Sequence, residues 1–287
     1  MTSATDRPGS DDRGSAIGAA PAPEHHHLAL LRAKGICKRF GGVQALSDVD
    51  FNIDHGEIYG LIGPNGAGKT SLFNVLTGIY AHDGGEFVFD GLPLTGLKPH
   101  EVAGRGIART FQNIRLFANL SALENVMIGR HVRTKAGVWG AIVRDRATRA
   151  EERAIERRAY ELLEYVGVHR RANDLAKHLA YGDQRRLEIA RALATEPKLL
   201  ALDEPAAGMN ATETESLKAL LEDIRHDGTT ILLIEHDMKL VMNVCDRVLV
   251  LDYGKKIAEG SAGQVQSDPK VIQAYLGGEI TLGGKGV

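Results

Sequence analysis

The chain has 287 residues, a length that fits one large domain or two smaller ones, and 43% of them are hydrophobic, which is enough for a sizeable core. The formal net charge is only −2 at pH 7, so composition gives no electrostatic reason to expect nucleic-acid binding. The two cysteines, Cys37 and Cys245, match no metal motif or disulfide framework and are expected to be buried, reduced thiols.

Residues 1–27 are predicted to form a disordered tail, because they are rich in Ser, Gly, Asp, Arg, Ala and Pro and contain no signal-peptide core. His25, His26 and His27 end this tail, and a solvated tail is favoured over a metal site because no further ligand lies nearby. No apolar run approaches the roughly 20 residues that a membrane helix needs. We therefore expect a cytosolic protein whose membrane role comes through a partner.

The ordered part of the chain is predicted to begin near Leu28, with antiparallel strands. Residues 28–40 and the alternating segment 48–53 have the pattern of such strands. The apolar segment 57–63 predicts another strand, which a glycine-rich loop separates from a helical segment at 71–80. A hairpin is expected around Gly91.

A largely helical region is predicted between about residues 113 and 196. Ser121 and Glu124 have the spacing of a capping box, so a helix is expected to start there. Residues 144–166 are dense in Arg, Glu and Ala. The apolar face of this segment would consist of Ile155, Leu162, Leu163 and Val166.

Strands and helices alternate in the remainder of the chain. Short apolar strands are predicted at 198–205 and 229–237, the second covered on both faces. The segment 212–215 has capping-box spacing and predicts a helix that ends near Arg225. A hairpin turning at Gly254 and a helix over 269–277 follow. This order favours an α/β fold with a mainly parallel sheet, an N-terminal antiparallel β subdomain and a helical insertion.

The glycine-rich segment GPNGAGKT fits the phosphate-loop pattern, and it lies where that loop must lie, between a strand and a helix. Glycines let backbone N–H groups curl around phosphate oxygens, and the helix N-terminus adds unpaired donors. The lysine supplies a full charge to the β and γ phosphates, and the threonine offers a hydroxyl to Mg²⁺. The predicted binding residues are Gly63, Pro64, Asn65, Gly66, Ala67, Gly68, Lys69, Thr70 and Ser71.

Two acidic residues end the predicted strand at 198–205. Asp203 is placed where phosphate-loop proteins keep the acid that holds Mg²⁺, directly or through water. Glu204 follows it and is predicted to orient or deprotonate the attacking water, a role that phosphoryl transfer requires.

Five motifs in order resemble the ATPase subunit of ABC transporters: GPNGAGKT, RTFQN, LAYGDQRR, LLALDEP and LLIEHD. The resemblance covers residues 28–277, with a helical subdomain at about 113–196, and leaves 278–287 as a C-terminal tail. It implies a P-loop NTPase core that hydrolyses ATP with Mg²⁺. It also implies that Gln112 joins the core to the helical subdomain and senses Mg²⁺ or water, that His236 contacts the γ-phosphate, and that Phe40 stacks on adenine, although core packing of Phe40 remains an equal alternative.

The LAYGDQ segment is similar to the family's signature motif, which binds the nucleotide held by a second ATPase subunit. The resemblance implies that Ala180, Tyr181, Gly182 and Asp183 act in trans in a head-to-tail dimer. The common form is Leu-Ser-Gly-Gly-Gln, and Ala180 lacks the serine hydroxyl, which should cost about 1.5–3 kcal/mol of γ-phosphate binding. Asn210 stands where the family often has Asp. We expect an active ATPase with a somewhat weakened dimer.

The segments RTFQNIRLFANLSALENVMIG, EPAAGMN and VIQAYLG resemble ATPase subunits of branched-chain amino acid importers. That resemblance implies that residues 113–119 receive a helix of a membrane permease subunit. It also implies an indirect link to an external substrate-binding protein, and a peripheral location on the cytoplasmic side of the membrane. The alternatives are the ATPase of lipopolysaccharide export, a soluble non-transport ABC ATPase and a phosphate-loop kinase.

Overall fold

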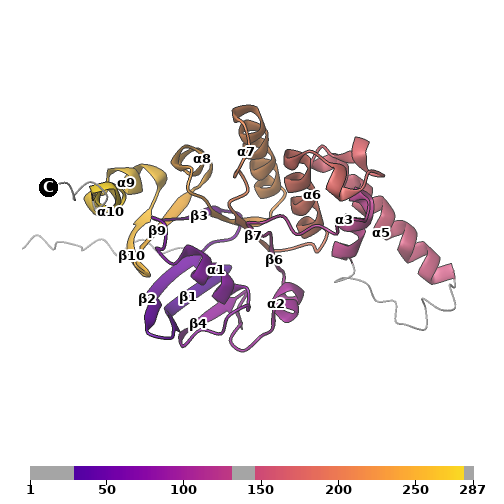
Figure 1. Cartoon of the computed structure of the whole chain (residues 1–287). Coiled ribbons are helices and arrows are strands. Elements are labelled where there is room, and N and C mark those ends of the chain that lie inside the picture. The colour runs from indigo at the N-terminus through magenta and orange to yellow at the C-terminus, as the bar shows by residue number, and fades with distance from the viewer. Residues whose placement is uncertain (1–28, 131–145, 281–287) are drawn as a thin grey trace, which may run out of the picture.

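The computed structural model describes residues 29–130 and 146–280 (Figure 1). The predicted tail at 1–27, with its three histidines, and the end of the C-terminal tail, 281–287, lie outside the described residues. Within the described ranges, no helix has both the length and the apolar character needed to cross a membrane.

A six-stranded sheet forms the centre of the molecule, with the order β10-β9-β3-β8-β7-β6. All neighbouring pairs are parallel except β9 and β10, which form the predicted hairpin at Gly254. The central strands read as continuous apolar runs because both faces of the sheet are covered. The strands are β3 (Ile58–Ile62), β6 (Ile107–Arg109), β7 (Leu199–Asp203), β8 (Thr230–Ile234), β9 (Arg247–Asp252) and β10 (Lys255–Gly260).

A second, antiparallel sheet with the order β2-β1-β4-β5 confirms the predicted N-terminal β subdomain and the hairpin around Gly91. Figure 1 shows it on the side of the central sheet opposite helices α6, α7 and α8, with α1 between the two sheets. Each face of the central sheet therefore has its own apolar core. The strands are β1 (Leu31–Phe40), β2 (Val43–Ile53), β4 (Gly84–Phe89) and β5 (Leu92–Pro93).

Helices make up most of the described residues between 113 and 196, as predicted. Glu124 N–H donates to Ser121 Oγ, and Ser121 N–H donates to a Glu124 carboxylate oxygen, so the expected capping box is present. Leu162, Leu163 and Val166 are buried, while Ile155 is half-buried. The main helices are α3 (Ala122–Arg130), α5 (Arg146–Tyr165) and α6 (Tyr181–Leu193), with short 3-10 helices at His169–Arg171 and Ala176–His178.

The remaining helices lie on both sides of the central sheet, with α9 and α10 beside its edge strand β10 (Figure 1). The prediction of a capping box at 212–215 was wrong: Asn210 and Glu213 form it instead, because asparagine caps helices as well as serine does and the helix starts earlier. The last helix also continues past Gly277. The helices are α1 (Lys69–Leu76), α2 (Pro99–Arg105), α7 (Ala211–His226), α8 (Met238–Val244), α9 (Ala262–Ser267) and α10 (Pro269–Ile280).

The two cysteines differ in their surroundings. Cys245 is buried, as expected, and burial raises the pKa of its thiol. The expectation was wrong for Cys37, which is only half-buried. Its position in β1 is next to an irregularity in the pairing with β4, and its sulfur accepts a hydrogen bond from the N–H of Asp48.

Candidate functional site

The glycine-rich loop connects the end of β3 to the start of α1. Gly63 and Gly68 have φ angles of +149° and +104°, which side chains rarely adopt. A β-carbon would lie 2.1 Å from the carbonyl oxygen of Leu251 at Gly63 and 2.7 Å from that of Ala45 at Gly68. Gly68 is the N-cap of α1 and no side chain caps this helix end, so first-turn backbone N–H groups remain for an anion.

Lys69 lies beneath the loop and is almost buried. Its ammonium group donates to the carbonyl oxygens of Gly63 at 2.6 Å and Pro64 at 3.0 Å. Burial lowers the pKa of Lys69, and the nearby carboxylates of Glu204 and Asp203 oppose that shift. The loop, its lysine and both predicted acids therefore belong to one electrostatic site.

Asp203 ends β7 with its side chain turned into the protein, where it is 4% exposed. Burial raises the pKa of this carboxyl, and the Arg109 guanidinium acts in the opposite direction. The buried Asp203 carboxylate and the Thr70 hydroxyl are both hard oxygen donors of the kind that Mg²⁺ prefers, so their chemistry fits that ion.

Glu204 is held in a strained backbone conformation with a φ of +49°. Its N–H donates to the carbonyl oxygen of Ile234, which joins the ends of β7 and β8. Its carboxylate accepts a hydrogen bond of 3.0 Å from the Gln112 amide and lies 3.8 Å from His236 Nδ1. The structure therefore brings together three predicted catalytic residues from distant parts of the sequence.

The glycine-rich loop, Lys69, Gln112 and Glu204 line a cavity of about 400 Å³, here called the nucleotide cavity, whereas Asp203 and His236 are not among its lining residues. The sequence predicted most of its lining but missed two contributions. One is the start of β2, and the other is the turn between β9 and β10 with the exposed Tyr253. The lining residues are Val43, Gln44, Ala45, Asn65, Gly66, Ala67, Gly68, Lys69, Thr70, Ser71, Gln112, Glu204, Tyr253 and Gly254.

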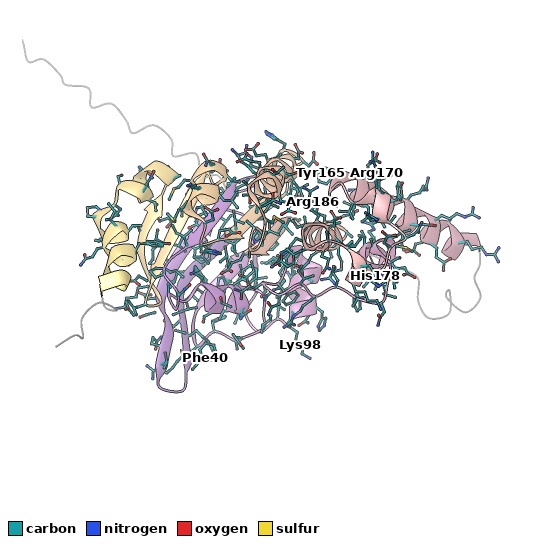
Figure 2. The ribbon with its side chains drawn as sticks, turned by 45° about the horizontal axis from the view of Figure 1, so that its top comes forward. Phe40, Lys98, Tyr165, Arg170, His178 and Arg186 are labelled. Carbon is teal, nitrogen blue, oxygen red and sulfur yellow. The ribbon has the colours of Figure 1, made fainter. Side chains whose placement is uncertain are left out.

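Phe40 lies at the end of β1, by the turn into β2 (Figure 2). It is not among the residues that line the nucleotide cavity. Its ring contacts Tyr80 edge-on, with 5.1 Å between the centroids, and is 41% exposed. Adenine stacking by Phe40 thus stays a prediction, with the ring accessible but partnered by Tyr80.

The signature residues form the N-terminus of α6, with Ala180 as N-cap and Asp183 in the first turn. None of Ala180, Tyr181, Gly182 and Asp183, all of which are described, lines the nucleotide cavity of the same chain. Tyr181 is half-exposed, and its hydroxyl accepts a 3.0 Å hydrogen bond from Arg185. A second helix N-terminus, with Ala180 and Tyr181 exposed, thus lies outside the lining of the nucleotide cavity.

Arg185 and Glu188 connect the signature helix to the Gln112 segment, and the sequence analysis missed both. Arg185 donates to the carbonyl oxygens of Phe111 and Gln112, and its 4% exposed side chain lies 3.5 Å from that of Glu188. Glu188 in turn accepts weak hydrogen bonds from the N–H groups of Phe111 and Arg115. Burial raises the pKa of Glu188.

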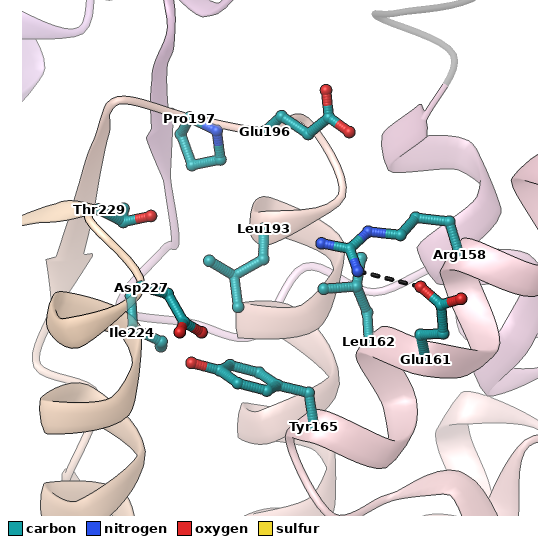
Figure 3. Close-up of a pocket in the computed structure, with 10 residues that line it drawn as sticks. All are labelled: Arg158, Glu161, Leu162, Tyr165, Leu193, Glu196, Pro197, Ile224, Asp227 and Thr229. Carbon is teal, nitrogen blue, oxygen red and sulfur yellow. Dashed lines mark hydrogen bonds and ion pairs between the residues drawn. The ribbon is translucent and has the colours of Figure 1, made fainter.

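A second cavity of about 450 Å³ opens between α5, α6 and α7, and we call it the α5–α7 cavity (Figure 3). It contains none of the predicted site residues. Arg158 and Glu161 form an exposed ion pair of 3.0 Å at one side, and the hydroxyl of Tyr165 points toward Asp227. The other lining residues are Leu162, Leu193, Glu196, Pro197, Ile224 and Thr229.

An apolar groove of about 430 Å³ follows the segment after Gln112. Phe111, Arg115 and Phe117 line it together with Ile128 and Ala192 from the helical region. Phe117 is 49% exposed, and Ile114 and Leu116 are half-buried. An exposed aromatic ring in an apolar groove is the kind of feature that marks a contact surface.

Known proteins match most of the chain. The ABC transporter family profile matches residues 46–207, and a profile for branched-chain amino acid ATP-binding cassette transporters matches 255–281. The high-affinity branched-chain amino acid transport ATP-binding protein LivG of Escherichia coli is 46% identical over 250 residues, 86% of this chain and 98% of that protein. BraF of Pseudomonas aeruginosa, described in the same words, is 44% identical over 249 residues, with the same coverage.

Solved structures of ABC transporter cassettes also match this chain. The ADP conformation of MJ1267, an ATP-binding cassette of an ABC transporter, superposes with a TM-score of 0.76 at 33% identity and covers 87% of this chain and 99% of its own. The dimeric cassette MJ0796 has a TM-score of 0.70 at 27% identity, covering 81% and 98%. These matches confirm the predicted ABC ATPase fold. The chain belongs to the ABC transporter family, as one of its ATP-binding, ATP-hydrolysing subunits.

Proposed function

We propose that this chain powers an importer for branched-chain or other hydrophobic amino acids. The main support for ATP hydrolysis is one cavity that the phosphate loop lines together with Gln112 and Glu204, with His236 3.8 Å from the Glu204 carboxylate. The substrate class is supported by the names of LivG and BraF and by the match of residues 255–281.

The β and γ phosphates of ATP would bind the backbone N–H groups of the loop and the Lys69 ammonium. Thr70, Asp203 and Gln112 would hold Mg²⁺, which neutralises charge on the phosphate oxygens. Ser71 and the loop residues from Gly63 onward complete this binding surface. Phe40 or the exposed Tyr253 would contact the adenine ring.

Glu204 would take the proton from the water that attacks the γ-phosphorus, so that ATP and water yield ADP and phosphate. Its fixed backbone and its hydrogen bond from Gln112 position the carboxylate for this work. His236 would contact the γ-phosphate from the end of β8 and keep Glu204 in place.

A second ATPase subunit, either this chain or a relative, would complete each site with its signature helix. The N-terminus of α6 does not line the nucleotide cavity of its own chain, which suits contact with a nucleotide held elsewhere. Ala180, Tyr181, Gly182 and Asp183 would then approach the γ-phosphate across the interface. Loss of that phosphate on hydrolysis would weaken the contact and open the dimer.

Membrane permease subunits would dock in the apolar groove beside Phe117, in the segment 113–119 that follows Gln112. Occupancy of the nucleotide cavity could reach that groove through Gln112 and through the Arg185 contacts to the same segment. A substrate-binding protein would take part indirectly, no nucleic acid would be involved, and the chain would lie at the cytoplasmic side of the membrane.

Lipopolysaccharide export is the second candidate. The ATP-binding protein LptB of Haemophilus influenzae, named for that system, is 34% identical over 255 residues, below the identity of LivG and BraF.

The test is uptake by cells that carry the complete transporter. We expect the unaltered chain to co-purify with hydrophobic membrane subunits and to support uptake of leucine, isoleucine or valine, and Glu204→Gln to abolish that uptake while the complex still forms. Normal uptake with Glu204→Gln would contradict the proposed mechanism. Co-purification with lipopolysaccharide-export subunits would contradict the proposed substrate.

A further inference from the structure

The C-terminal helix α10 faces the outer side of the phosphate loop. A cavity of about 500 Å³ lies between them, lined by Pro64, Asn65, Gly66 and Ala67 from the loop and by Lys270, Gln273 and Ala274 from α10. Asn65, Gly66 and Ala67 also line the nucleotide cavity on the other side. The loop therefore separates the nucleotide cavity from the cavity beside the C-terminal helix.

Tyr275 follows directly after two of these residues and brings a polar atom into the apolar core. The helix is anchored one turn earlier by Val271, which is 3% exposed. The phenol oxygen of Tyr275 is buried and has no hydrogen-bond partner of ordinary geometry within the described part of the chain. The group beside it is the backbone N–H of Gly63: burial raises the pKa of Tyr275, and this N–H opposes the rise.

Gly63 is the first residue of the loop, and its contacts couple its position to that of its neighbours. Its α-carbon packs so closely on the Leu251 carbonyl that no β-carbon fits. Its own carbonyl oxygen accepts the 2.6 Å hydrogen bond from Lys69. A group that fixes the N–H of Gly63 therefore restrains the residue whose carbonyl oxygen holds the phosphate-binding lysine.

The turn before β10 holds the other end of the loop. Gly254 N–H donates to the Ala67 carbonyl oxygen at 2.9 Å, and Ser47 N–H donates to the Gly254 carbonyl oxygen at 2.8 Å. The segment from this turn to α10 thus contacts the phosphate loop at both ends, at Gly63 and at Ala67. This segment coincides with the separate family match at 255–281.

We propose that Tyr275 is a positioning residue for ATP binding: its buried hydroxyl oxygen accepts a hydrogen bond from Gly63 N–H when the loop closes on nucleotide. The inference rests on the proposed binding of ATP by this loop. A buried oxygen without a partner is unfavourable, so gaining one on closure favours the nucleotide-bound state. The C-terminal segment thereby sets the affinity of a site that lies far from it in sequence.

The test compares Tyr275→Phe with Tyr165→Phe in the full chain. Both remove one phenol oxygen, but Tyr165 lines the α5–α7 cavity, away from the loop. Titration with a non-hydrolysable ATP analogue should show a Kd about three- to tenfold higher for Tyr275→Phe, and no change for Tyr165→Phe. Thermal unfolding should show an unchanged or higher Tm for nucleotide-free Tyr275→Phe, because an unpartnered buried oxygen has gone, and a smaller Tm increase on adding the analogue.

Three results would overturn the inference, and they separate its failure from that of the proposed function. An unchanged Kd for Tyr275→Phe, with normal binding by the unaltered chain, overturns the inference alone. So does a lower Tm of the nucleotide-free variant, which would mean general loosening of α10. Absence of binding by the unaltered chain would overturn the proposed function as well.

Discussion

The nucleotide cavity and the α5–α7 cavity have similar volumes, about 400 and 450 Å³, yet they differ in what they can bind. The first lies at the N-terminus of α1 and is lined by backbone N–H groups and a lysine. The second lies at the C-terminal ends of α6 and α7, where the helix dipole is negative, and its three carboxylates, Glu161, Glu196 and Asp227, outnumber the single Arg158. Volume alone does not identify a phosphate site, whereas the polarity of helix ends and the charges around them do.

The largest difference between the cavities should appear when one carboxylate is neutralised in each. Glu204→Gln should lower the kcat for ATP hydrolysis by about 10³-fold, because the proton acceptor is lost, while ATP affinity is retained. Glu161→Gln should leave kcat unchanged, since Glu161 is 60% exposed and pairs only with Arg158 in the described interactions. Steady-state hydrolysis and ATP titration measure both. Equal rates for the two variants would contradict the assignment of Glu204.

Ion pairs near the two cavities should differ in their contribution to stability. Arg185→Ala removes one of the two arginines that face the buried Glu188, leaving Arg191 at 3.7 Å. It also removes the hydrogen bonds to the carbonyl oxygens of Phe111 and Gln112, so it should lower the free energy of unfolding by about 3 kcal/mol. Arg158→Ala breaks an exposed pair and should cost about 0.5 kcal/mol or less. Urea unfolding monitored by circular dichroism gives both values. A loss below about 1 kcal/mol for Arg185→Ala would show that the contacts between α6 and the Gln112 segment are weak.

One substitution in the signature helix, Ala180→Ser, should increase the rate of ATP hydrolysis. Ala180→Ser restores a hydroxyl that can donate to the γ-phosphate, so hydrolysis by the assembled transporter should rise by up to about tenfold. Ala262→Ser introduces the same hydroxyl in the first turn of α9 and should leave the rate unchanged. No gain from Ala180→Ser would mean that this helix end does not reach the nucleotide.

The smallest expected effect is a dependence on pH of the Mg²⁺ concentration that hydrolysis requires. Burial raises the pKa of Asp203, so its carboxyl takes up a proton at higher pH than an ordinary aspartate does. Protons then compete with the metal, and the Mg²⁺ concentration for half-maximal hydrolysis should rise several-fold between pH 7.5 and 6. EDTA should stop hydrolysis at every pH. A half-maximal concentration that does not change with pH would place the metal away from Asp203.

The sequence predicted most of the nucleotide cavity because its chemistry is local. GPNGAGKT contains its own turn glycines, lysine and hydroxyl, and Asp203 and Glu204 stand out as acids at the end of an apolar strand. Antiparallel and parallel strands were likewise predicted from their apolar patterns. The cap at Asn210 was misplaced by two residues because Thr212 and Glu215 offered an equally good pattern.

Contacts between residues that are distant in the sequence left no comparable pattern in the sequence. The paired Arg185 and Glu188 look like ordinary charges on a helix until packing buries them. Tyr275 reads as one more apolar position of a short helix, and only the fold brings its oxygen to Gly63. The α5–α7 cavity arises where three helices from separate segments fail to fill the space between them.

The most direct test removes the one cationic side chain that lines each cavity and measures equilibrium binding of ATP. Lys69→Ala should weaken ATP binding by at least about tenfold, because the loop loses the charge that pairs with the phosphates. Arg158→Ala should bind ATP as the unaltered chain does. Unchanged affinity for Lys69→Ala, or a loss confined to Arg158→Ala, would contradict the assignment of the phosphate loop as the nucleotide site.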